Sequence, residues 1–95
     1  MVVVGTEAID RFLKKHPECQ EELSELVRDL KANRFADPEA LRARFPSVRI
    51  VDGKTAVFKV RGNRYRLIAA VAYKTQVFQV RAMVTHAEYD RKRLK

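Results

Sequence analysis

The stretch VFKVRGNRYRLIAAVAYKTQVFQVRAMVT, residues 57–85, decides the fold. Apolar side chains alternate with polar or small ones through most of it, which is the pattern of strands that bury one face. Gly62-Asn63 and residues 74–76 interrupt the alternation and supply turns. Just upstream, Asp52-Gly53 is a strong hairpin signal. We therefore predict an antiparallel meander over residues 47–86, with strands at 47–51, 55–60, 64–73 and 77–85.

The first half of the chain has helical periodicity instead. Residues 1–4, MVVV, form a short β-branched run that predicts a strand. Thr6 suits the N-cap of a first amphipathic helix, and Pro17 can occupy the first position of a second one. Asp37 and Pro38 are the cap and the first residue expected of a third, short helix.

Strand, helices and then a run of strands is an α+β order. We expect an N-terminal strand and two to three helices packed on one face of a mainly antiparallel sheet. The 95 residues make a single domain. We divide it into a helical part at 6–46, the meander at 47–86 and a basic tail at 87–95.

Composition favours a soluble protein without a disulfide or metal framework. The single cysteine, Cys19, lies on an apolar helical stripe, and the two distant histidines show no zinc-binding spacing. No apolar run is long enough to cross a bilayer, and MVVVG is too short for the hydrophobic part of a secretory signal. We expect a cytoplasmic protein with no membrane partner.

Positive charge is concentrated in the second half of the chain. The formal net charge is +8. Residues 1–48 carry eight Lys/Arg against nine Asp/Glu, whereas residues 49–95 carry twelve against three, and no acid lies between Gly53 and Ala87. A merely soluble surface mixes both signs. The excess therefore favours an anionic partner, nucleic acid above all.

Strand alternation divides the side chains of the meander between two faces. The expected apolar layer under the helices consists of Phe58, Val60, Tyr65, Leu67, Ala69, Val71, Tyr73, Phe78, Val80, Ala82 and Val84. The opposite face then collects Lys59, Arg61, Arg64, Arg66 and Arg81, with His86 at its edge. A one-residue bulge would exchange the faces beyond it, so this assignment assumes an unbulged sheet.

A floor of arginines with a histidine at its edge suits metal-independent RNA cleavage. The ribose 2′-hydroxyl attacks the adjacent phosphate, so the protein supplies a proton acceptor, a proton donor and positive charge. The predicted catalytic residues are His86, Tyr89, Arg66 and Arg81. The predicted phosphate-binding residues are Lys59, Arg61, Arg64 and Lys74. Tyr89 and Tyr73 are the few aromatics expected to be exposed, which favours recognition of the RNA backbone over stacking on bases.

The same residues also have purely structural interpretations. His86 can be an ordinary histidine at a strand end, and Tyr89 can be a packing residue. The arginines can pair with Glu88 or Asp90, the nearest acids in the second half. His16 lies at a helix boundary, and we assign it no role.

Two segments resemble the C-terminal half of HigB-type toxins, a branch of the RelE-like bacterial toxins. They are VFKVRGNRYRLIAAVAY, residues 57–73, and VFQVRAMVTHAEYD, residues 77–90. The specific elements are Phe58, the Gly62-Asn63 turn with Arg66 three residues after Asn63, Arg81, and the motif Thr85-His86-x-Glu88-Tyr89-Asp90. The segment PEALRARFPS at 38–47 extends the likeness more loosely.

This resemblance implies a small α+β domain that cleaves mRNA, usually within the translating ribosome. It also implies neutralisation by a co-expressed HigA-type antitoxin that carries a helix-turn-helix domain. Neither a metal nor a small-molecule cofactor is expected. The resemblance makes His86 and Tyr89 the proton-handling pair and Arg66 and Arg81 the phosphate clamps, while Lys59 lies at a position that varies within the family.

We therefore predict an endoribonuclease toxin that acts on mRNA at the ribosome. A non-catalytic RNA- or ribosome-binding module is an alternative, because the acid-free basic stretch explains it equally well. A basic protein that binds an acidic partner is a second alternative. Only the pairing of His86 with Tyr89 separates the enzyme from these binding proteins.

Overall fold

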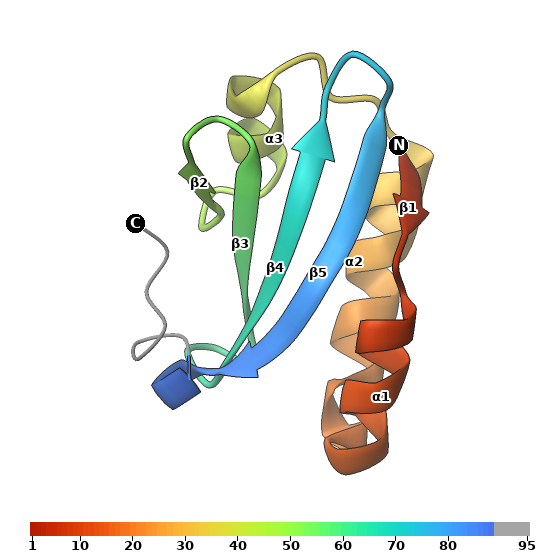
Figure 1. Ribbon diagram of the computed structural model, residues 1–95, viewed down its shortest axis with the longest axis vertical. Coiled ribbons are helices and arrows are strands. Elements are labelled where there is room, and N and C mark those ends of the chain that lie inside the picture. The colour runs from red at the N-terminus through yellow and green to blue at the C-terminus, as the bar shows by residue number, and fades with distance from the viewer. Residues whose placement is uncertain (89–95) are drawn as a thin grey trace.

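The computed structural model describes residues 1–88, in which strands and helices follow the α+β order (Figure 1). The elements are β1 (Val2–Val4), α1 (Glu7–Lys15), the 3₁₀ turn η1 (Pro17–Cys19), α2 (Gln20–Ala32), α3 (Pro38–Arg44), β2 (Arg49–Val51), β3 (Thr55–Val60), β4 (Tyr65–Ala72) and β5 (Val77–Thr85). The predicted fold class is confirmed, and so are the four strands of the meander. Within residues 1–88, no helix combines the length and the apolar character needed to cross a bilayer.

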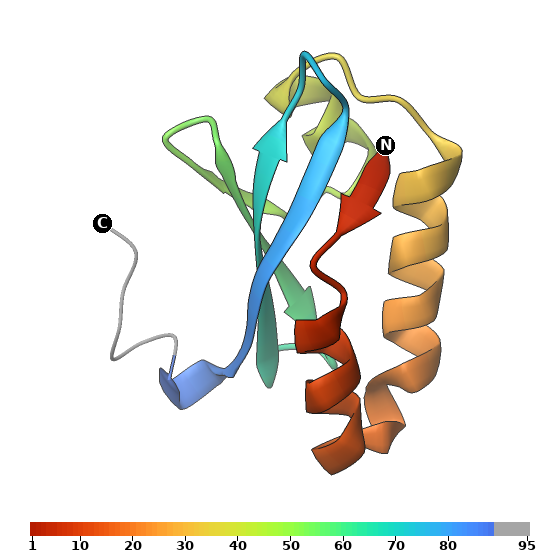
Figure 2. The same ribbon diagram turned by 45° about the vertical axis from the view of Figure 1, so that its right-hand side comes forward.

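The strands form a single five-stranded sheet in the order β1-β5-β4-β3-β2. β1 is parallel to β5, and the other neighbouring strands are antiparallel, so the sheet is mainly antiparallel as predicted. Figure 2 shows α1 and α2 side by side along one side of the sheet. β1 pairs with residues 77–79 of β5, so along the edge of β5 that is opposite β4 the second half of the strand lies beside α1.

The turns between antiparallel strands lie where the sequence predicted them. Asp52 and Gly53 have φ values of 55° and 69°, the left-handed pair that the Asp-Gly hairpin signal favours. Arg61 and Gly62, with φ values of 54° and 67°, begin the β3–β4 turn, and Gln76, with a φ of 58°, ends the β4–β5 turn. These turns set the strand register, and with it the side chains that meet across the sheet.

The predicted helix starts agree only in part. Asp37 caps α3 by accepting a hydrogen bond from the backbone N–H of Ala40 at 2.9 Å, as expected. Thr6 precedes α1, but its side chain makes no capping hydrogen bond. The prediction that Pro17 begins the second α-helix is wrong, because Pro17 opens a 3₁₀ turn and α2 starts at Gln20. Such tighter turns are frequent at helix N-termini.

One apolar core fills the space between the helices and the sheet. Its buried members include Leu23 and Leu30 of α2, Leu41 of α3 and Leu67 of β4. Cys19 is fully buried in the same core, and this burial raises the pKa of its thiol. This burial agrees with the apolar stripe on which the sequence places Cys19.

Gly5 allows the chain to pass from β1 into α1 in close contact with β5. Its φ is +77°, and a Cβ at this position would lie 2.5 Å from the carbonyl oxygen of Val80. Both the left-handed backbone and the close approach therefore require glycine here.

A β-bulge in β5 overturns part of the predicted face assignment. Val80 pairs with Ala69 and Ala82 pairs with Ile68, so Arg81 is the extra residue between the two pairs. The extra residue shifts the alternation by one position, and the faces exchange beyond it.

The exchange moves two apolar residues away from the helices. Met83 packs against the core, whereas Ala82 and Val84 join Val57 and Ile68 in a second cluster on the other face of the sheet. The prediction that Ala82 and Val84 lie under the helices is therefore wrong, because it assumed an unbulged strand.

Candidate functional site

The β3–β4 turn and the end of β5 meet at one end of the sheet (Figure 1). Tyr65 pairs with Thr85 in the β4–β5 ladder, and the backbone N–H of His86 donates to the carbonyl oxygen of Arg64 at 2.8 Å. The ladder therefore brings His86 directly beside the turn at residues 61–64.

Arg66 is buried beneath this turn, with only 6% of its surface exposed. Its guanidinium donates to the backbone oxygens of Asn63 and Tyr65 at 3.1 and 3.2 Å, and to Oδ1 of Asn63 at 2.7 Å. Nη2 of the same group lies 3.1 Å from Nδ1 of His86. The turn thus holds the guanidinium in a fixed orientation against the imidazole.

The contact between Arg66 and His86 determines which ring nitrogen carries the proton. A guanidinium has only donors, so Nδ1 of His86 must be the acceptor in this hydrogen bond. In the neutral imidazole the proton then lies on Nε2. The site therefore contains an N–H donor of histidine next to a fixed positive charge.

Lys59 adds a second cation from the neighbouring strand. Lys59 and Arg66 are direct partners across β3 and β4, and such partners lie on the same face of a sheet. The side chain of Lys59 is exposed. Together, Lys59, Asn63, Arg66 and His86 form what we call the histidine site.

A helical turn over residues 86–88 follows β5 and starts with a capping box. The backbone N–H of Thr85 donates to Oε1 of Glu88 at 2.8 Å, and the backbone N–H of Glu88 donates to Oγ1 of Thr85 at 3.1 Å. This reciprocal pair fixes the backbone around His86. Tyr89 and Asp90, which completed the predicted motif, lie outside the described residues.

The other predicted phosphate-binding residues do not all lie at this site. Arg61 and Arg64 are exposed in the β3–β4 turn next to it, where the backbone N–H of Arg61 also donates to Glu22 at 3.0 Å. Lys74 is exposed in the β4–β5 turn, at the opposite end of β4. The length of that strand separates Lys74 from the histidine site by roughly 23 Å.

Arg81 is also placed differently from the prediction. As the bulged residue of β5 it lines a groove toward α1, while Lys59 and Arg66 share the other face of the sheet. The prediction of one basic floor holding all five residues is therefore wrong. Arg61 and Arg64 lie in the β3–β4 turn at the end of the sheet, whereas Arg81 lies at the bulge in the middle of β5.

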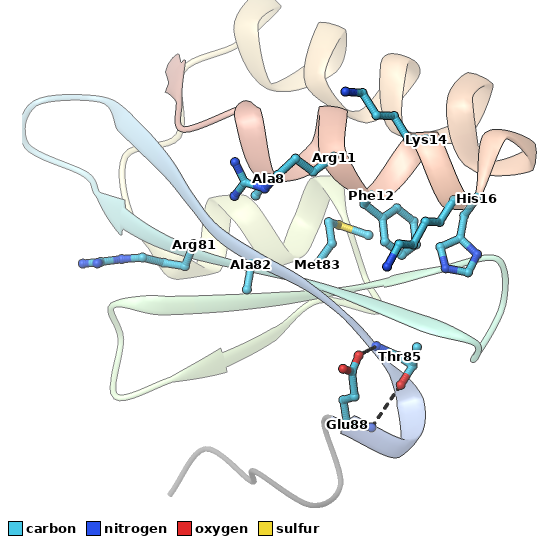
Figure 3. Close-up of a pocket in the computed structure, with 11 residues that line it drawn as sticks. Ala8, Arg11, Phe12, Lys14, His16, Arg81, Ala82, Met83, Thr85 and Glu88 are labelled. Atoms are coloured by element: carbon cyan, nitrogen blue, oxygen red, sulfur yellow. Dashed lines mark hydrogen bonds between the residues drawn. The ribbon is translucent and has the colours of Figure 1, made fainter.

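The groove lined by Arg81 has a volume of about 980 Å³ and lies between α1 and the second half of β5 (Figure 3). We call it the α1–β5 groove. The α1 side contributes Arg11, Phe12, Lys14, Lys15 and His16. The β5 side contributes Arg81, Ala82 and Met83, with Thr85 and Glu88 at the end nearest the histidine site.

His16, to which the sequence assigned no role, lies in this groove. Its ring stacks on Phe12 with centroids 4.5 Å apart, and its Nδ1 lies 3.1 Å from the hydroxyl oxygen of Tyr65. The contact joins residues 49 positions apart, so no local pattern could reveal it. The one local feature that the sequence offers here is the interruption of helical periodicity at residues 16–18, His-Pro-Glu, and it indicates a helix end but no contact with Tyr65.

The Tyr65 hydroxyl also lies 3.4 Å from Oε2 of Glu18. Desolvation raises the pKa of Tyr65, with the charge of Glu18 adding to the effect, so the phenol stays protonated and acts as a donor. A backbone hydrogen bond lowers the pKa of Glu18, assisted by the nearby His16. The cluster therefore ties η1 and the end of α1 to the start of β4.

Two further expectations concern aromatic and metal-binding groups. The sequence placed Tyr73 in the apolar layer and also among the candidate exposed aromatics; it is partly buried against the core, so the apolar-layer prediction is confirmed and the exposed one is wrong. Its hydroxyl has no hydrogen-bond partner within residues 1–88, and burial raises its pKa. Among the same residues, no three His, Cys, Asp or Glu side chains are grouped to hold a metal ion.

Comparison with known proteins places this chain in a family. Residues 19–92 match the family described as HigB_toxin, RelE-like toxic component of a toxin-antitoxin system. The chain is 34% identical over 93 residues to "mRNA interferase toxin HigB" of Escherichia coli K12, covering 95% of this chain and 88% of that protein. It is 30% identical over 93 residues to "mRNA interferase HigB" of Escherichia coli O6:H1, with 96% and 90% covered.

Proposed function

Because this chain belongs to the HigB family of RelE-like toxins, we propose that it is the toxin of a toxin-antitoxin pair and an endoribonuclease that cleaves mRNA. The relatives named mRNA interferases align over nearly its whole length, which supports this assignment. The observation that carries the mechanism is the 3.1 Å contact between Arg66 and His86.

In the proposed reaction the RNA supplies its own nucleophile. The 2′-oxygen forms a bond to the adjacent phosphorus, and the bond from phosphorus to the 5′-oxygen breaks. The proton of the 2′-hydroxyl passes to a base, and the leaving 5′-oxygen takes a proton from an acid. The products are a 2′,3′-cyclic phosphate and a free 5′-hydroxyl.

We propose that His86 is one of the two proton-handling groups, because its contact with Arg66 places the proton of the neutral ring on Nε2, from which it can donate a hydrogen bond to the leaving 5′-oxygen. Arg66 and the nearby Lys59 stabilise the additional negative charge of the pentacoordinate phosphorus, as preorganised donors do at other developing anions. Tyr89, which lies outside the described residues, remains the proposed second proton-handling group. Arg81 contacts the RNA from the α1–β5 groove, on the other face of the sheet from Lys59 and Arg66.

We also propose the partners that such a toxin needs. The family description, toxic component of a toxin-antitoxin system, supports an antitoxin protein, and we propose one of the HigA type. We propose that cleavage takes place on mRNA held by the translating ribosome, and therefore in the cytoplasm. The excess of cations over residues 53–87 supports a contact with RNA phosphates in that setting.

The test is a His86→Ala variant whose fold is checked by circular dichroism and thermal melting. Transcript 5′ ends are mapped after brief induction, with Thr75→Ala, an exposed change in the distant β4–β5 turn, as the control. Loss of a proton-handling group should slow cleavage by about 10²- to 10⁴-fold and abolish growth inhibition. A folded His86→Ala protein that cleaves like the parent would rule out the catalytic assignment.

The same experiment separates the enzyme from its main alternative. A non-catalytic RNA-binding module would inhibit growth without producing new 5′ ends, and its inhibition would survive the loss of His86. Ribosome sedimentation of the variant completes the comparison. Under our proposal the variant still sediments with ribosomes although it no longer cleaves.

A further inference from the structure

The α1–β5 groove is lined by cationic and aromatic side chains that are not part of the histidine site. Figure 3 shows Arg11 and Lys14 on the α1 side of the groove and Arg81 on the β5 side. With Lys15 and the imidazole of His16, the groove has four permanent positive charges and one titratable group. Glu88 is the one acid among the described residues that line it, and its carboxylate accepts the capping hydrogen bond from Thr85.

These cations are available to a ligand. Arg11, Lys14, Lys15 and Arg81 are exposed, and within residues 1–88 none of them takes part in an ion pair. A polyanion that neutralised them would release counterions and gain affinity in proportion to the number of contacts.

The floor of the groove is apolar and aromatic. Phe12 lies between the cations, stacked on His16 at 4.5 Å and in edge contact with Tyr65 at 5.0 Å. Met83 lies below it on β5 (Figure 3). Cations that follow a backbone beside an aromatic platform are the usual arrangement for unpaired nucleic acid, because only unpaired bases can leave their stack to contact a side chain.

The groove is continuous with the histidine site. Thr85 and Glu88 line its end, and His86 lies between them in the chain. A strand bound in the groove would therefore lead directly to the imidazole. The α1 side of the groove also lies outside residues 19–92, the segment that matches the family.

We propose that the α1–β5 groove binds a short single-stranded segment of the substrate mRNA next to the cleaved phosphate, with a base on Phe12 and phosphates on the cations of α1. This inference rests on the proposed function, and it assigns a substrate subsite that extends beyond the histidine site. The aromatic floor and the continuity with His86 favour RNA over an acidic protein segment, which would need only the charges.

The first test removes three cations of the groove and compares the result with the loss of three cations elsewhere. The groove variant is Arg11→Gln/Lys14→Gln/Lys15→Gln. The matched control is Arg28→Gln/Lys31→Gln/Arg34→Gln, which removes three exposed cations in and just after α2. The probe is a fluorescent 2′-O-methyl RNA oligonucleotide, which cannot be cleaved, titrated at several salt concentrations.

The groove variant should lower the slope of log affinity against log salt by about two, because each contact to a single strand contributes about 0.7. At 0.1 M salt the same relation weakens binding by up to about a hundredfold. The control should keep the parent slope. Equal slopes and affinities for the two variants would overturn the proposal.

A second variant tests the stacking contact separately from charge. Phe12→Leu keeps an apolar side chain toward the core but removes the ring. Binding should weaken by about tenfold for the RNA probe, and it should not change for an otherwise identical oligonucleotide that lacks bases. Equal weakening for both oligonucleotides, or for neither, would contradict a base on Phe12.

Two controls separate this inference from its alternatives. His86→Ala is used only for the cleavage measurement, so a failure of the catalytic assignment leaves the comparison of the groove variant with the α2 variant interpretable. Poly-L-glutamate serves as the probe for an acidic protein partner. If the groove variant loses only the binding of poly-L-glutamate and keeps that of RNA, the groove is a protein-binding site and the proposal is wrong.

Discussion

Replacing Asn63 by alanine tests how the histidine site is held together. Oδ1 of Asn63 accepts a hydrogen bond from Nη2 of Arg66 at 2.7 Å, and the same nitrogen contacts Nδ1 of His86 at 3.1 Å. Asn63→Ala removes this acceptor but leaves the backbone oxygen of residue 63, which accepts from Nη1. The guanidinium then keeps its charge while losing the group that directs Nη2 toward the imidazole.

The magnitude follows from the kind of bond that is lost. Hydrogen bonds to charged groups contribute about 1.5–3 kcal/mol. Asn63 is exposed, so the lower end of that range applies, about 1.5 kcal/mol. If the whole of it acts in the transition state, cleavage slows by about tenfold. We expect this loss in the cleavage rate together with a decrease in Tm of several degrees, because the hydrogen bond is also present in the folded enzyme before RNA binds.

The assay is the rate at which a reporter transcript is cleaved during synchronised induction, normalised to the amount of folded toxin. Asn33→Ala is the matched control, since Asn33 is an exposed asparagine at the end of α2 whose side-chain amide donates to Asp29. Asn63→Asp keeps the acceptor but cancels part of the charge of Arg66. If Asn63→Asp cleaves faster than Asn63→Ala, the orientation of the Arg66 guanidinium is the important property. If Asn63→Asp cleaves more slowly, the positive charge of Arg66 is the important property. Parent-like cleavage by Asn63→Ala would refute the positioning role.

Three further predictions concern stability, each measured by thermal unfolding. Tyr73→Phe should stabilise the protein by about 1 kcal/mol, because the buried hydroxyl has no hydrogen-bond partner within residues 1–88; a lower Tm would show that it has one. Gly5→Ala should cost at least about 2 kcal/mol, because its φ is +77° and a Cβ would meet the oxygen of Val80 at 2.5 Å. Gly53→Ala, with a φ of +69° but nothing within 4 Å, should cost only about 1 kcal/mol, and equal losses would refute the steric explanation. Because the pKa of Glu18 is lowered in the folded protein, its carboxylate stabilises the fold above the ordinary pKa, and this effect is lost as the pH falls through the folded-state pKa. Between about pH 6 and pH 3 the Tm of Glu18→Gln should therefore fall less than the Tm of the parent. Parallel curves of Tm against pH would contradict this.

The histidine site shows which parts of a site can be predicted from sequence. Asn63 and Arg66 are three residues apart, and the turn between β3 and β4 brings them together locally. The capping box of Thr85 and Glu88 is likewise a local pattern. The sequence placed Arg66 on one face of the sheet and His86 at the edge of that face. The contact between the two side chains joins two strands, and only the β4–β5 ladder reveals it.

The bulge shows where such a prediction fails. The alternation around Arg81 is regular, and no residue in it marks an irregular position. Only the pairing of β5 with β4 reveals the extra residue, because a bulge is a relation between two strands and not a property of one. The prediction therefore placed Arg81 on the basic face of the sheet, whereas the bulge turns it toward the groove beside α1.

By itself, the sequence determined the order of elements, the strands of the meander, the turns between them and the concentration of positive charge, since each depends on neighbouring residues. The tertiary structure alone decided the exchange of faces beyond Arg81, the contact of His16 with Tyr65 and the groove between α1 and β5. These features arise where segments distant in the chain pack against each other, and their geometry depends on the mutual fit of whole surfaces.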